Sequence, residues 1–435
     1  MGKLYAEIYG CTANTADGEI ALGILKEAGW EIVDKPEDSD LILLVTCAVK
    51  KPTSDRMLHR IKALKIYGKT MIVAGCMASG EGDKVKRIAP EAVLVHPRAI
   101  TQILEAVESK KDLLTGDCVD KLGKSRVLKN RVVGIIPVSE GCRWGRCGFC
   151  IVPFTRGRFV SYSLDKIIDE ATRLISNGVM EIWLTSQDMG SYGLDFGRNM
   201  LPGLIKSIVS IPREFWVRIG MMNPIYLKPI LRELADLYLH PKVYKFLHIP
   251  VQSGSDKVLK AMNRGYTVSM FKEMIEYMKN RIENLTISTD IIVGYPGEDE
   301  EDFEKTIKLI KELEPDSVNI SKFFPRPHTS SERLPQLDPR IIKERSRHIT
   351  EVVREIAYKK NIRWIGWSGR ALVDEIGEGG EAIARNIYYK PIVLRDNCGH
   401  ILLGRKVEVE VIDAKPYCLI GRLIKILDRE ILEDG

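Results

Sequence analysis

The chain has 435 residues, of which 45% are hydrophobic and 29% are charged, and this composition favours two or three globular domains. Its net charge of +6 permits an acidic partner such as nucleic acid without requiring one. No apolar run is long enough to span a bilayer and no secretory signal is evident, so we expect a cytoplasmic protein with no membrane partner. There we expect the nine cysteines to be ligands, nucleophiles or buried thiols.

The first segment alternates strand and helix patterns, which predicts a parallel sheet with helices on its faces. Strand patterns cover residues 4–9, 41–46, 70–75 and 92–96, and helical patterns cover residues 17–28, 53–66 and 82–88. Cys11, Cys47 and Cys76 follow or end the first three strands. Because parallel strands end at one edge, we expect these thiols to converge there. Simple packing of small apolar side chains is the alternative.

A charged stretch separates this segment from the next. Residues 105–130 lack clear periodicity, and we interpret them as a linker with some helix, with the linker between the domains at residues 111–130. Residues 112–119, which include Cys118, are expected to form a short pairing segment. The first domain therefore covers residues 1–110.

Strand–helix alternation resumes on a larger scale over residues 131–367. Strand patterns cover residues 132–138, 181–185, 216–221, 245–249, 286–292 and 317–323. Six units are too few for a closed eight-stranded barrel, so we predict a partial (βα)6 barrel with its site at the C-terminal ends of the strands. A long helical pattern over residues 339–365 closes this domain.

The last segment, residues 368–430, changes to short β-rich runs separated by turn signals, which predicts a small antiparallel β-barrel. Barrels of this size often bind oligonucleotides, although fold alone does not establish function. Basic side chains that could grip phosphates are Arg385, Lys390, Arg395, Arg405, Lys406 and Arg422. Glutamates interspersed in the same segment weaken this signal.

Three cysteines, Cys142, Cys147 and Cys150, lie within nine residues directly after the predicted strand 132–138. Soft thiolates select iron–sulfur clusters or zinc. A cubane cluster has four corners, so three local ligands leave one iron open for a substrate or cofactor. Zinc would need a fourth ligand and prefers paired CxxC motifs.

This motif, with Phe149 before the last cysteine, resembles the cluster loop of radical S-adenosylmethionine (SAM) enzymes. The common spacing there is C-x3-C-x2-C, whereas this chain has C-x4-C-x2-C, and Gly145 could absorb the extra residue in a tight turn. The whole chain resembles the radical-SAM methylthiotransferases, which end in a TRAM-type RNA-binding domain. Segments that carry this likeness are residues 9–14, 151–158, 246–254, 289–298 and 324–327. Residues 183–188 and 218–224 are most similar to the archaeal and eukaryotic branch, which modifies N6-threonylcarbamoyladenosine in tRNA.

The resemblance implies two [4Fe–4S] clusters and SAM as cofactors. Cys142, Cys147 and Cys150 would hold the cluster that binds SAM. An auxiliary cluster would carry sulfur on Cys11, Cys47 and Cys76. A radical derived from SAM would remove hydrogen from C2 of the adenine at position 37, and a methylthio group would replace it.

The implied partners are the anticodon stem-loop of tRNA, a one-electron reductant and a sulfur donor. One rival hypothesis keeps the chemistry but changes the target to isopentenyladenosine in tRNA or an aspartate of a ribosomal protein. Another is a non-enzymatic iron–sulfur protein that binds RNA or senses redox state.

Other candidate cofactor-binding residues lie at strand ends or beside the cluster loop. The positions that would contact SAM, besides Phe149, are Ser186, Gln187, Gln252, Ser253 and Asp290. Local loop capping is the alternative for the serines and glutamines. Arg156 and Arg158 would bind the SAM carboxylate or an RNA phosphate, or form a solvated pair. We expect His248 to be structural, and Cys118, Cys398 and Cys418 not to be ligands.

Overall fold

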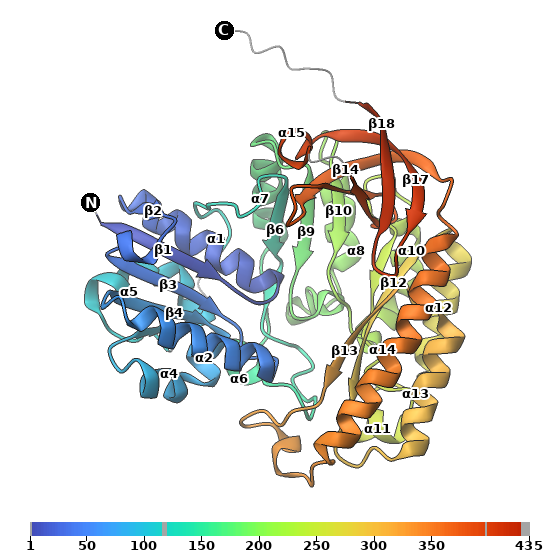
Figure 1. Ribbon diagram of the computed structural model, residues 1–435, viewed down its shortest axis with the longest axis horizontal. Helices are drawn as coiled ribbons and strands as arrows, with labels where there is room; N and C mark the ends of the chain where they lie inside the picture. The colour runs from blue at the N-terminus through green and yellow to red at the C-terminus, as the bar shows by residue number, and fades with distance from the viewer. Residues whose placement is uncertain (1, 115–119, 396–397, 428–435) are drawn as a thin grey trace.

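The computed structural model describes residues 2–114, 120–395 and 398–427. They form a parallel α/β unit, a partial barrel with helices outside, and a small closed β-barrel (Figure 1). This arrangement confirms the predicted α/β fold class. No helix among the described residues has the length and apolar character that crossing a membrane requires.

The N-terminal sheet has five parallel strands in the order β2-β1-β3-β4-β5. They are β1 (Lys3–Ile8), β2 (Glu31–Val33), β3 (Leu41–Thr46), β4 (Thr70–Gly75) and β5 (Val93–Val95). Helices α1 (Thr12–Glu27) and α5 (Ile103–Ser109) cover one face, and α2 (Lys51–Lys65) and α4 (Gly82–Ile88) cover the other. Burial on both faces explains the continuous apolar runs of β3 and β4. Strand β2 lies at the sheet edge with little burial, so its sequence gave no strand pattern.

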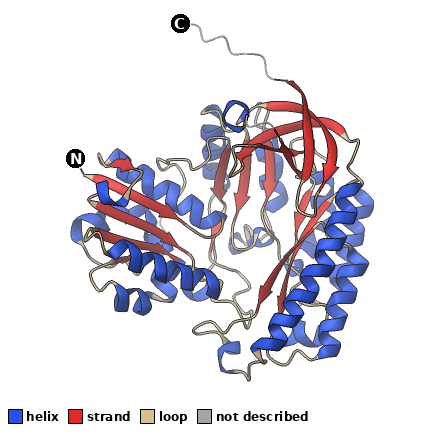
Figure 2. Ribbon diagram, in the orientation of Figure 1, coloured by secondary structure: helices blue, strands red, loops and turns tan. Residues whose placement is uncertain are grey.

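The central domain has six parallel strands in chain order. They are β6 (Val133–Pro137), β9 (Glu181–Thr185), β10 (Trp216–Ile219), β11 (Phe246–His248), β12 (Thr286–Val293) and β13 (Ser317–Lys322). Two three-stranded ladders meet where Val217 of β10 bridges to Val243 just before β11. The partial barrel is therefore confirmed, and its helices lie outside the strands (Figure 2).

Six helices flank these strands. They are α7 (Leu164–Ser176), α8 (Leu201–Val209), α10 (Leu231–Tyr238), α12 (Val268–Arg281), α13 (Glu300–Leu313) and α14 (Pro339–Ile362). One core cluster joins their inner faces to the strands.

The C-terminal barrel closes in the order β14-β15-β16-β18-β17. Its strands are β14 (Ser368–Ile376), β15 (Ala382–Asn386), β16 (Pro391–Leu394), β17 (Lys406–Ala414) and β18 (Leu419–Ile426). All neighbours are antiparallel except β16 and β18, which are parallel. The prediction of a fully antiparallel barrel is therefore wrong at this pair. Strand β17 pairs with β14 and β18 rather than with β16, so β18 lies next to β16 and runs in the same direction.

This barrel is fastened to the amino ends of the central strands by Tyr389. Its ring lies 4.8 Å from the rings of Tyr244 and Phe246. The Arg218 guanidinium lies over the rings of Tyr389, Phe246 and Trp183, at 5.0–5.3 Å. Such contacts gain strength when the cation is desolvated, so they hold the two domains in one orientation.

Two basic residues expected to grip phosphates are instead paired with carboxylates of the protein. Arg385 binds Asp374 and Glu375, and Lys390 is buried and binds Asp316 at 2.7 Å. This corrects the expectation for both, since their charges are neutralised inside the protein. The sequence could not reveal it because the partner of Lys390 lies 74 residues away.

The carboxyl group of Glu181 at this junction predicts a pH effect. Burial and the nearby Asp374 raise its pKa from 4.5 to about 8, so the folded protein keeps a proton that the unfolded chain releases. Stability attributable to this group is therefore present below about pH 4.5 and is lost as the pH rises towards 8. We expect Glu181→Gln to be more stable than the parent by about 1–3 kcal/mol near pH 8.5 and nearly equal near pH 5. Urea denaturation at the two pH values checks this, and an equal difference at both would contradict it.

Candidate active site

Three strand ends of the N-terminal sheet bring Cys11, Cys47 and Cys76 together. Cys11 follows β1 as the N-cap of α1, Cys47 follows β3, and Cys76 comes directly after β4. Burial raises the pKa of Cys76 to about 11; the Arg156 guanidinium opposes this shift, and the neighbouring Cys11 and Cys47 thiols add to it. Cys47 and Cys76 are buried whereas Cys11 is exposed, so this trio is open on one side.

Asn14 ties these strand ends to one another. Its Nδ2 donates to the carbonyl oxygens of Tyr9 at 3.0 Å and Thr46 at 2.8 Å. Its Oδ1 lies 3.8 Å from the Cys76 sulfur. Gly10 makes this approach possible, because its φ is +110° and a Cβ there would lie 2.6 Å from Asn14 Nδ2. The turn between β1 and α1 therefore fixes Cys11 beside Cys47.

The second trio lies on the loop between β7 (Ser139–Glu140) and α6 (Val152–Arg156). Strand β7 pairs with β8 (Val160–Ser161), so the loop is closed at its base. Gly145 adopts φ +58°, which is the tight turn expected for the longer spacing. The three cysteines lie on this one loop, and burial raises the pKa of Cys150, with the neighbouring Cys147 and Cys142 thiols adding to the shift.

Each sulfur of this loop faces a hydrogen-bond donor. Arg264 Nη1 donates to the Cys147 sulfur at 3.1 Å. Backbone N–H groups of Gly145 and Val152 face the sulfurs of Cys142 and Cys150. Donors to sulfur stabilise thiolate and tune a cluster that they hold, so this set fits an anionic iron–sulfur cluster.

The side chains are not arranged for a single ion. Among the described residues, no three His, Cys, Asp or Glu side chains form a group that could hold one metal ion. A cubane cluster makes a different demand, because each sulfur ligates a different iron and the ligands stay further apart.

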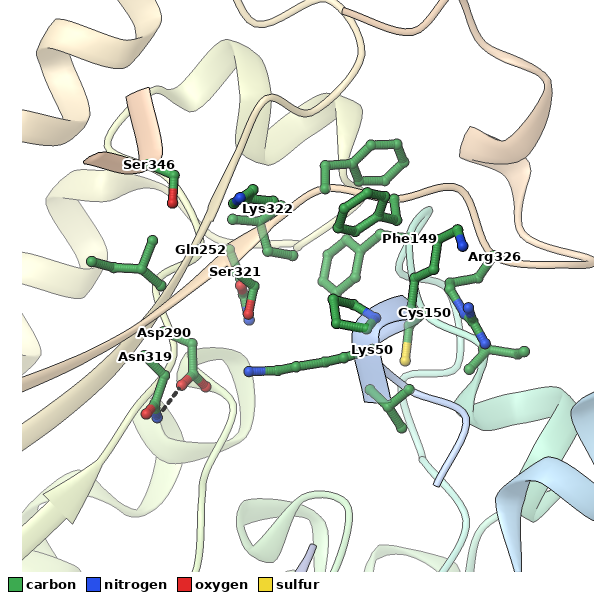
Figure 3. Close-up of a pocket in the computed structure, with 18 residues that line it drawn as sticks. Lys50, Phe149, Cys150, Gln252, Asp290, Asn319, Ser321, Lys322, Arg326 and Ser346 are labelled. Atoms are coloured by element: carbon green, nitrogen blue, oxygen red, sulfur yellow. Dashed lines mark hydrogen bonds between the residues drawn. The ribbon is translucent and has the colours of Figure 1, made fainter. Parts of the chain in front are cut away.

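A cavity of about 600 Å³ lies between the N-terminal and central domains, beside Cys150 (Figure 3). Residues 49–52, which follow Cys47, form one wall. The cluster loop at residues 149–151 and the ends of β12 and β13 form the rest. The cavity is thus lined by Cys150 of the second trio, its opposite wall begins two residues after Cys47 of the first trio, and it is large enough for a small-molecule ligand.

Asp290 is the carboxylate of this cavity. His248 Nε2 lies 3.1 Å from its Oδ2, and Asn319 Nδ2 donates to Oδ1 at 2.7 Å. Burial alone would raise the pKa of Asp290, but His248, Asn319 and Lys50 together lower it. His248 therefore positions Asp290.

The four strand-end residues expected to contact SAM divide into two kinds. Ser186 accepts the N–H of Asp188 at 3.1 Å, and Ser253 accepts that of Ser255 at 3.2 Å, so both cap local turns. The side-chain oxygens of Gln187 and Gln252 are buried and have no hydrogen-bond partner among the described residues. An unpaired buried acceptor is costly, and these two glutamines fit a missing polar ligand.

Arg156 lies in a buried cluster of four charges that joins the two domains. It contacts Asp17 of α1 at 2.9 Å and Glu140 of β7 at 2.7 Å. Lys121 contacts the same carboxylates at 2.6 and 2.5 Å. We name Asp17, Lys121, Glu140 and Arg156 the interdomain charge cluster. Arg156 also donates to Asn14 Oδ1 at 2.6 Å. The Arg156 guanidinium therefore binds carboxylates of the protein itself, and the expectation that it binds the SAM carboxylate or an RNA phosphate is wrong.

Several residues that shape the site were not singled out by sequence patterns. They are Asn14, Asp17, Lys50, Lys121, Glu140, Arg264 and Asn319. Cys398 and Cys418 lie in the C-terminal barrel, away from both trios, and Cys118 lies outside the described residues.

Comparisons with known proteins agree with this architecture. The family model of the Radical SAM superfamily matches residues 136–310, that of Uncharacterized protein family UPF0004 matches residues 3–96, and that of the TRAM domain matches residues 368–424.

The fold is also similar to that of solved radical SAM enzymes. The radical SAM methyltransferase TsrM from Kitasatospora setae has a TM-score of 0.57 at 15% identity, over 76% of this chain and 74% of that one. The cobalamin-dependent radical SAM enzyme OxsB has a TM-score of 0.52 at 11% identity, over 82% and 56%. These two likenesses show the fold alone. The family matches make the chain a radical SAM protein with a C-terminal TRAM domain, and this class implies SAM and a [4Fe–4S] cluster.

Sequence relatives narrow the class. A probable threonylcarbamoyladenosine tRNA methylthiotransferase from Pyrococcus horikoshii is 39% identical over 98% of this chain and 100% of the relative. One from Archaeoglobus fulgidus is 39% identical over 97% and 98%. The threonylcarbamoyladenosine tRNA methylthiotransferase of Homo sapiens is 34% identical over 97% and 74%. The chain belongs to this family of radical-SAM methylthiotransferases, which favours an enzyme over the binding or sensing alternative.

The interdomain charge cluster predicts a matched pair of variants. Arg156→Gln leaves Asp17 and Glu140 with Lys121 as their only cation, so we expect a loss of about 3–5 kcal/mol in unfolding free energy. Arg158→Gln, at an exposed position two residues away, should change it by less than about 0.5 kcal/mol. Chemical denaturation of both variants measures this, and similar losses in the two would refute the role of the cluster.

Proposed function

We propose that the chain converts N6-threonylcarbamoyladenosine at position 37 of tRNA, next to the anticodon, to its 2-methylthio derivative. The observation that carries this proposal is a cavity lined on one wall by Cys150 of one trio and on the opposite wall by residues 49–52, which closely follow Cys47 of the other trio. The names of the relatives support the same substrate. The target base has to leave its stack to enter such a cavity, as a base in an anticodon loop can.

The residues assigned to cofactors follow from the two trios. Cys142, Cys147 and Cys150, which are free thiols here, would hold the cluster that binds SAM, and the free thiols of Cys11, Cys47 and Cys76 would hold an auxiliary [4Fe–4S] cluster. When bound, the clusters and SAM supply the one-electron chemistry and the sulfur that substitution at an unreactive aromatic C–H bond requires. The reaction consumes an electron and a sulfur atom, so a one-electron reductant and a sulfur donor are further partners, in the cytoplasm.

The chain's own residues bind and orient SAM and exclude water from the cavity. Gln252 and Asp290 present polar groups to SAM from the strand ends, while Arg264 keeps its hydrogen bond to the Cys147 sulfur. Phe149 and Phe323 contribute aromatic surface to the cavity wall, which excludes water from a site of radical chemistry. The TRAM domain contributes RNA contacts.

The product identifies the reaction. Anaerobically reconstituted protein is incubated with reductant, SAM, sulfide and tRNA that bears threonylcarbamoyladenosine. The tRNA is then digested, and the masses of its nucleosides are measured by mass spectrometry. We expect a mass gain equal to replacement of one hydrogen by a methylthio group on that nucleoside, and none on isopentenyladenosine in a parallel reaction. A gain on isopentenyladenosine alone would overturn the substrate assignment.

Single cysteine variants separate the two trios. Cys142→Ala should abolish release of 5′-deoxyadenosine from SAM, because the cluster that binds SAM loses a ligand. Cys47→Ala should retain that release but form no methylthio product, because only the auxiliary cluster is damaged. Loss of 5′-deoxyadenosine in both variants to the same extent, with the other cluster intact by iron analysis, would contradict the division of roles.

A further inference from the structure

The cavity beside Cys150 contains cationic side chains with different surroundings. Arg326 is buried and contacts Glu81 at 3.0 Å, and Lys51 contacts Asp55 at 2.7 Å. Lys50 and Lys322 also line the cavity, are exposed, and make no salt bridge within the described residues. The cavity therefore offers two ammonium groups whose charge no carboxylate of the described chain neutralises by direct contact.

Lys50 occupies a particular place among these groups. It follows Cys47 by three residues, and its backbone N–H faces the Cys47 sulfur. Its side chain extends from the N-terminal domain across the cavity towards Asp290 and Asn319 (Figure 3). The ammonium group thus lies between the cysteine trio of the N-terminal sheet and the strand ends of the central domain.

Asp290 does not serve as a dedicated partner for Lys50. It is already bound by His248 and Asn319 at 3.1 and 2.7 Å, and Lys50 acts on it only through its charge. With one carboxylate and two unpaired ammonium groups, the cavity favours an anionic ligand group. A carboxylate is a strong partner for such a cation, because a charge-assisted hydrogen bond is stronger than a neutral one.

Two ligands can supply that carboxylate, namely the methionyl part of SAM and the threonyl part of the modified adenosine. SAM belongs beside the cluster loop at Cys150, whereas Lys50 comes from the opposite wall, three residues after Cys47. The target carbon has to lie between the two trios, so the wall with Lys50 is the one that the substrate nucleoside faces. Unmodified adenosine and isopentenyladenosine carry no carboxylate at this position.

We propose that Lys50, assisted by Lys322, is a specificity-determining residue that binds the carboxylate of the threonylcarbamoyl group. This inference rests on the proposed function, because it assumes that the modified nucleoside enters this cavity. It gives the chain a physical basis for choosing a charged modified adenosine over an apolar one, since the two lysines remain unpaired with the apolar substrate.

Binding of short RNA tests the proposal without turnover. Reconstituted protein is titrated with anticodon stem-loops that differ only at position 37, which is threonylcarbamoyladenosine, isopentenyladenosine or adenosine. We expect the parent protein to bind the first stem-loop most tightly. Lys50→Gln should lose about tenfold in affinity for that stem-loop and little for the other two. Lys50→Arg keeps the charge and should retain most of the preference.

Lys62→Gln is the matched control, because it removes an exposed lysine of the adjoining helix α2 that is not among the residues lining the cavity. It should bind all three stem-loops as the parent does. An undiminished preference in Lys50→Gln would overturn the proposal, as would an equal loss in Lys62→Gln.

The Michaelis constant for SAM separates the two carboxylate sources. A rise in this constant in Lys50→Gln, with the stem-loop preference unchanged, would assign Lys50 to SAM and overturn the proposal. If the parent forms methylthio product but Lys50→Gln keeps the preference, only the role of Lys50 fails. If the parent forms no product from the threonylcarbamoyl RNA and shows no preference for it, the proposed function fails and the role of Lys50 falls with it.

Discussion

The interdomain charge cluster is the interaction on which the rest of the site depends. Lys121 and Arg156 are almost completely buried, as are Asp17 and Glu140, and desolvating four charges is expensive unless each is paired. Here each carboxylate contacts both cations. Asp17 belongs to α1, and Glu140 and Arg156 flank the cluster loop. The pairing is satisfied only when the two domains adopt one relative position, so the cluster sets the separation of the two cysteine trios.

The same arrangement explains how buried thiols of the N-terminal sheet can serve as ligands. Burial raises the pKa of Cys47 and Cys76, while the Arg156 guanidinium opposes the shift at both. Asn14 connects Arg156 to the strand ends. The residue that locks the domains together thus also lowers the cost of thiolate at the auxiliary trio. The C-terminal barrel is fastened at the amino ends of the central strands, opposite the cavity.

Sequence patterns predicted those parts of the fold that depend on local periodicity. The apolar strands β3 and β4, the six central strands and the spacing of Cys142, Cys147 and Cys150 all carry local signals. Strand β2 was missed because an exposed edge strand of three residues has no distinctive pattern. The charge cluster was missed for a different reason. Arg156 and Asp17 are 139 residues apart, and no local rule indicates which charges pair after folding. The sequence places Lys121 in a charged linker, where an exposed side chain is expected, yet its side chain is fully buried.

Counting iron tests most directly whether each cysteine trio holds a cluster of its own, as the proposed function requires. Protein reconstituted without oxygen should hold about eight irons per chain, and about four when either trio is replaced by alanine. The variant that lacks Cys142, Cys147 and Cys150 should keep the auxiliary cluster, and the variant that lacks Cys11, Cys47 and Cys76 should keep the other. If the second variant retained all the iron of the parent protein, the auxiliary cluster and the two-sided site would both be contradicted.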